Sequence, residues 1–76
     1  MKLSNPAHWR DGAGNVIACT EKIKVLNENL EELRQVAQDA FEDGVLMACC
    51  EQQLRDAFVE VIGKLTNPYS SIRHPC

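Results

Sequence analysis

The fold of this chain follows chiefly from residues 20–41, which read TEKIKVLNENLEELRQVAQDAF. The apolar residues of this stretch recur at alternating spacings of three and four, which places them along one side of an α-helix. They form an apolar seam made of Ile23, Leu26, Leu30, Leu33, Ala37 and Ala40. Val36 and Phe41 widen the apolar face in the second half, as is typical of a helix covered by more than one neighbour. We therefore expect a long amphipathic helix.

The first helix is predicted to begin at Thr20, whose hydroxyl is a suitable N-cap. Its end depends on Gly44, because a glycine often terminates a helix. Against a stop there, Glu42 and Asp43 carry the wrong charge for a helix C-terminus. We expect the helix to run through Gly44 and to turn near residues 48–50, with a break at Gly44 as the alternative.

A second, shorter amphipathic helix is predicted over residues 51–65. Its apolar stripe has helical spacing and consists of Leu54, Ala57, Phe58, Val61, Ile62 and Leu65. Asn67 and Pro68 should end the helix, because a proline disfavours helical geometry in the residue before it. Two acid–base pairs have the favourable i, i+4 order, namely Glu51 with Arg55 and Glu60 with Lys64.

The chain is expected to be one domain in three parts: a head (residues 1–19), a helical hairpin (20–66) and a flexible tail (67–76). In the head, residues 11–15 read DGAGN and favour a turn. Short segments compatible with β-structure flank this turn, so the head is predicted to be irregular or a short β-hairpin. Its residues most suited to packing on the helices are Trp9, Val16 and Ile17.

Two helices provide one contact surface rather than an enclosed core. In a chain of 76 residues, this favours an assembly that covers the remaining apolar face. We expect a mainly all-α protein, a helical hairpin that dimerises into a four-helix bundle. A protein partner that supplies the missing helices is the alternative. The residues predicted to line the oligomer or partner surface are Ile23, Leu26, Leu30, Leu33, Ala37, Ala40, Leu54, Phe58, Val61 and Ile62.

Charge and composition argue against several classes of partner. Eleven acidic and eight basic residues give a net charge of −3, without a basic cluster. Nucleic acids and anionic membrane surfaces both attract Lys-rich and Arg-rich patches, so neither is an expected partner. There is no apolar run of about 20 residues, and the first residues lack the apolar region of a signal peptide. A cytoplasmic location is therefore expected.

The sulfur and imidazole groups offer an alternative function. Cys49, Cys50, His74 and Cys76 include ligands that bind soft metals such as zinc. However, the sequence has no C-x-x-C motif, and adjacent cysteines fit poorly around one tetrahedral ion. We expect no metal and no cofactor. Cys50 is predicted to face the helix contact, with Cys49 and Cys19 filling small spaces.

The sequence carries no strong signal for catalysis. A Cys–His nucleophile pair would need a pocket and an oxyanion site, and two helices offer little concavity. The turn at residues 11–15 does not match a calcium loop, because Ala13 and Lys22 stand where oxygen ligands are required. We predict a small non-enzymatic helical interaction or accessory protein. A thiol-binding or metal-binding module is the alternative.

Overall fold

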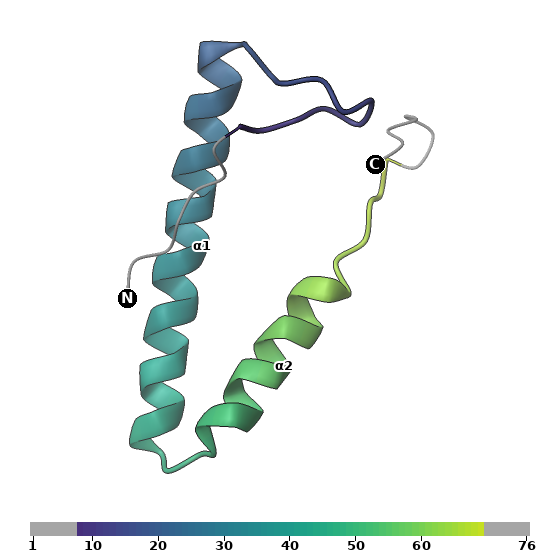
Figure 1. Cartoon of the computed structure of the whole chain (residues 1–76). Helices are drawn as coiled ribbons and strands as arrows, with labels where there is room; N and C mark the ends of the chain where they lie inside the picture. Colours follow the sequence, from purple (N-terminus) through teal and green to yellow (C-terminus); the bar gives the residue numbers. More distant parts are fainter. Residues whose placement is uncertain (1–7, 70–76) are drawn as a thin grey trace. The chain divides into compact units, whose positions relative to one another are not determined.

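The computed structural model describes residues 8–69. These residues form two helices, α1 (Thr20–Leu46) and α2 (Glu51–Gly63), which are labelled in Figure 1. Helices hold 65% of the described residues, and no sheet is present among them. The prediction of a mainly helical chain with one long and one shorter helix is therefore confirmed, whereas the dimeric bundle stays a prediction.

α1 begins close to the predicted residue. The N–H of Ile23 donates to the carbonyl of Cys19 at 3.1 Å, which is the first turn of the helix. Because the N-cap residue is the one whose carbonyl accepts this bond, Cys19 is the N-cap and Thr20 is the first helical residue. The predicted N-cap was wrong by one position, within the usual uncertainty of helix ends.

α1 continues through Gly44, as predicted, and ends at Leu46, slightly before the turn expected near residues 48–50. The N–H of Ala48 donates to the carbonyl of Val45, and that of Cys49 donates to the carbonyl of Gly44, both at 3.0 Å. Together with the positive φ of 65° at Ala48, these bonds form a Schellman motif. The helix therefore ends at a turn that satisfies its last carbonyls, without a glycine at the terminating position.

α2 has an unusual N-terminus and a slightly early end. Cys50 is its N-cap, with an extended backbone (φ −60°, ψ 125°) and no hydrogen bond from its side chain to the helix. At the other end the helix stops at Gly63, two residues before the predicted Leu65. The N–H of Lys64 still donates to the carbonyl of Glu60 at 3.1 Å, which closes the last turn.

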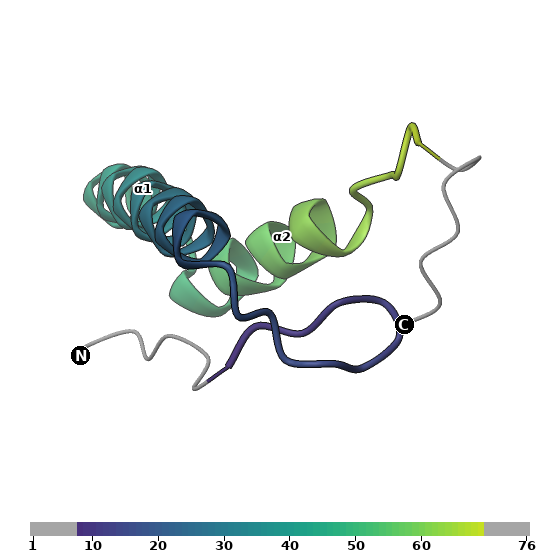
Figure 2. The same ribbon diagram turned by 90° about the horizontal axis from the view of Figure 1, so that it is seen from above.

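The described contacts divide the chain into two units, and α1 contributes to both. The first unit holds the head and α1 up to Glu32, and the second holds residues 33–67. Within the second unit the chain reverses after α1, and α2 diverges from the C-terminal part of α1 with distance from the turn (Figures 1 and 2). This arrangement fits the predicted helical hairpin.

The head contains the predicted turn but not two strands. Arg10 and Val16 form one isolated antiparallel bridge around residues 11–15. Inside the turn, a carboxylate oxygen of Asp11 accepts the N–H groups of Ala13 and Asn15 at 3.0 and 2.9 Å. Of the two forms predicted for the head, the described residues thus show the irregular one. Two short strands without a third to pair with are marginal, which explains the single bridge.

Candidate interaction surface

The contact between the two helices lies near the turn. The rings of Phe41 in α1 and Phe58 in α2 meet edge to face, with centroids 6.5 Å apart and an interplanar angle of 73°. The guanidinium of Arg55 lies over the Phe41 ring, 4.7 Å from its centroid. Leu54 packs on the backbone of Gly44, the one buried residue among residues 8–69. A small aromatic and aliphatic cluster therefore joins the helices.

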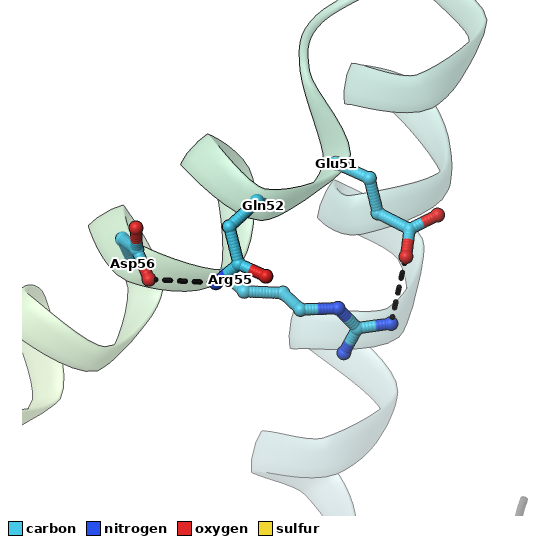
Figure 3. A network of polar contacts seen from close by, with 4 residues as sticks. All are labelled: Glu51, Gln52, Arg55 and Asp56. Atoms are coloured by element: carbon cyan, nitrogen blue, oxygen red, sulfur yellow. Dashed lines mark hydrogen bonds and ion pairs between the residues drawn. The ribbon is translucent and has the colours of Figure 1, made fainter.

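Polar side-chain pairs link successive turns of α2. Figure 3 shows the ion pair between Arg55 Nη2 and Glu51 Oε2 at 3.4 Å, beside the 2.9 Å hydrogen bond from Gln52 to Asp56. The second predicted pair, Lys64 with Glu60, has an N–O distance of 2.8 Å. Both predicted pairs are confirmed. Because they are exposed, each contributes little to stability, on the order of 0.3–0.5 kcal/mol.

In the second unit, the predicted oligomer or partner surface is only partly covered. Ala37, Leu54 and Phe58 are half-buried, whereas Ala40 is exposed. Leu33, Val61 and Ile62 retain 46%, 63% and 47% of their accessible surface. The structure thus brings Leu54 and Phe58 into the helix contact and leaves the rest of the α2 stripe open.

The prediction did not include the partners of Leu54 and Phe58 across the helix contact. These are Phe41 and Gly44. The spacing of apolar and small residues in the sequence could have placed both on this face. Phe41 widens the apolar face of α1, and Gly44 continues the seam of α1 one turn after Ala40 with helical spacing.

In the first unit, the head is attached to α1 by a specific hydrogen bond. The indole Nε1–H of Trp9 donates to Oδ1 of Asn27 at 2.7 Å, and this bond is partly buried. Trp9 and Ile17 are half-buried, in keeping with their predicted packing role, whereas Val16 is 46% exposed. The seam residues of this unit are also half-buried, namely Ile23, Leu26 and Leu30.

The same unit has a shallow, open hollow on the first two turns of α1. It is lined by Glu21, Lys22, Val25 and Leu26. Its lining is aliphatic and carries no convergent set of polar groups, so it lacks the features of a catalytic site.

The described cysteines do not occupy the predicted positions. Cys19, Cys49 and Cys50 are all exposed. The predictions that Cys50 faces the helix contact and that the other two fill small spaces were therefore wrong. The reason is local geometry, because Cys19 and Cys50 are N-caps and Cys49 lies in the turn, so none belongs to a helix face.

The proposed thiol or metal site is incomplete in the described part of the chain. His74 and Cys76 lie outside residues 8–69. Within that range, no three His, Cys, Asp or Glu side chains come together in a way that could hold a metal ion. The alternative function therefore gains no supporting geometry from Cys49 and Cys50.

The described residues define a two-helix protein with a turn-containing head and apolar helix faces that are only partly covered. In residues 8–69, neither helix combines the length and the apolar character needed to cross a bilayer. No protein-family model matches the chain, and comparison with curated proteins and with solved structures found no significant similarity.

Proposed function

We propose that this chain is a small non-enzymatic accessory protein that works by helix–helix association through its apolar seam. Its preferred partner is a second copy of the same chain, and a different protein docked on the same seam is the alternative. One observation carries the proposal: among residues 8–69, no apolar side chain is buried. A helical chain without a buried apolar core lacks the main source of folding free energy.

The exposed side chains are placed where a partner helix would add to an existing contact. On α2, Leu54 and Phe58 touch α1, and Val61 and Ile62 continue the same stripe toward the end of the helix. Burying a Val or Ile side chain completely contributes roughly 1.5–3 kcal/mol. A second hairpin packed on this stripe would complete a four-helix bundle and recover that free energy.

The proposal places the protein in the cytoplasm, where cysteine thiols stay reduced. The association it describes is hydrophobic and needs no disulfide. This separates it from the alternative thiol function, in which oxidation of the exposed cysteines would couple two chains.

The proposal is tested by size-exclusion chromatography with light scattering, with and without reductant. The expected mass is twice the chain mass of 8.5 kDa under both conditions. Val61→Lys should give a monomer, because it places a charge in the apolar stripe. Val59→Lys is the matched control: Val59 is 71% exposed and lies about 200° away around the same helix, so the dimer should persist.

Each other outcome has a defined meaning. A wild-type monomer that unfolds cooperatively would contradict self-association. A wild-type monomer without a cooperative transition would favour a different protein partner on the seam. A dimer that disappears on addition of reductant would favour cysteine coupling.

A further inference from the structure

The last residue of α1 and the first residue of the turn after it are large, exposed and apolar, and the seam does not include them. Leu46 and Met47 retain 85% and 76% of their accessible surface, the two largest values for large apolar residues in the described chain. Leu46 follows Gly44 by two residues, which is about 200° around a helix. Since Gly44 faces α2, Leu46 lies on the opposite, polar side of α1. A partner on the seam would therefore leave it exposed.

The surroundings of Leu46 are acidic. Glu42 and Asp43 precede it by four and three residues and are its neighbours on the helix surface. Asp39 lies one further turn back, and residues 35–50 contain no Lys or Arg. An exposed apolar patch with a polar rim is a feature of interaction sites, and here the rim has a single sign of charge.

Several local features of this turn lower stability. Acidic residues stand near the C-terminus of α1, where the helix dipole favours cations. Ala48 adopts a positive φ, which favours glycine. Cys50 caps α2 without a side-chain hydrogen bond. Locally unfavourable choices that gather in one segment are expected at functional positions.

We propose that Leu46 and Met47, with Asp39, Glu42 and Asp43 around them, form a second docking surface for a basic amphipathic helix of another protein. The apolar stripe of that helix would cover Leu46 and Met47, and its lysines or arginines would face the acidic rim. Charge complementarity of this kind sets partner choice and orientation. An anionic membrane is disfavoured, because the same rim would be repelled by its headgroups.

The experiment titrates the full, isotope-labelled chain with a short synthetic amphipathic peptide made only of leucine and lysine. A peptide of the same pattern made of leucine and glutamate is the charge control. The lysine peptide should shift backbone amide signals of residues 45–51, and its affinity should fall as salt is added, because exposed charges are screened. The glutamate peptide should not bind.

Two glutamine variants test whether the side chains of Leu46 and Met47 form this surface. The double variant Leu46→Gln, Met47→Gln should lower the affinity by at least about tenfold, with helicity unchanged in circular dichroism. Val59→Gln, at a position on α2 that is 71% exposed, should leave the affinity within about twofold. Equal binding of both peptides, unchanged affinity of the double variant, or shifts at Leu33, Val61 and Ile62 instead of the turn would overturn the proposal. The oligomer mass is read separately, so failure of self-association does not affect this result.

Discussion

Leu54 in α2 lies directly against the backbone of Gly44 in α1. A Cβ atom on Gly44 would be 2.6 Å from Cδ2 and 2.8 Å from Cδ1 of Leu54, well below the ordinary contact distances of 3.4–4 Å. Gly44 therefore sets how closely the two helices approach. The same residue weakens α1 as an isolated helix, because glycine is less favourable than alanine in a helix interior by about 1 kcal/mol. Packing and helix propensity thus oppose each other at this position.

Because of this opposition, Gly44→Ala should change the free energy of unfolding in opposite directions with and without the Leu54 side chain. Gly44→Ala in the wild-type chain should lower the free energy of unfolding by about 1 kcal/mol. The clash with Leu54 destabilises the fold by more than the higher helix propensity of alanine stabilises it. In a Leu54→Ala background the same substitution should raise it by about 1 kcal/mol, because the obstructing side chain is gone. Urea unfolding followed by circular dichroism measures both. Equal effects in the two backgrounds would show that the contact is not tight.

The positive φ of Ala48 leads to a second prediction. An L-amino acid in left-handed geometry pays a steric cost that glycine avoids. Ala48→Gly should therefore raise the free energy of unfolding by about 0.5–1 kcal/mol. Ala40→Gly, inside α1, is the matched control and should lower it by about 1 kcal/mol. If both glycine variants changed the free energy of unfolding in the same direction, this would contradict the Schellman turn.

The absent side-chain cap at Cys50 leads to a third prediction. Serine at an N-cap accepts an N–H of the first helical turn, which cysteine does not do here. Cys50→Ser should raise the free energy of unfolding by about 1 kcal/mol, measured by thermal or urea unfolding under reducing conditions. Cys49→Ser, one residue earlier and outside the cap, should have no effect. Equal stabilisation by both variants would indicate a general effect of removing thiols.

The hydrogen bond from Trp9 to Asn27 gives a fourth prediction. Asn27→Ala leaves the partly buried indole N–H without its acceptor, a change that costs about 1–3 kcal/mol locally. Fluorescence of Trp9, the single tryptophan of the chain, should shift to longer wavelength as the head detaches from α1. Asn29→Ala, at an exposed position two residues away, should leave the emission unchanged. An unaltered spectrum in both variants would mean that the bond does not attach the head.

The helix ends follow only in part from the sequence. α1 runs through Gly44, as predicted, but the charge of Glu42 and Asp43 does not explain it, because the helix ends at Leu46 and leaves Asp43 in its last turn. The N-cap of α1 was assigned to Thr20 on side-chain chemistry, yet the backbone bond from Ile23 places it at Cys19. Caps depend on the exact residue at which the backbone leaves the helix, and apolar periodicity does not resolve a single position.

Periodicity and charge spacing in the sequence were sufficient for two helices, their polar pairs Glu51–Arg55 and Glu60–Lys64, and the apolar seam. These features are local, because residues three or four apart are neighbours on any helix. Only the tertiary structure decided that Leu54 meets Gly44, that Phe58 meets Phe41, that Trp9 donates to Asn27, and that Val61 stays exposed. Such contacts join residues far apart in the chain, and their geometry depends on how the backbone turns between them, which a local pattern does not encode.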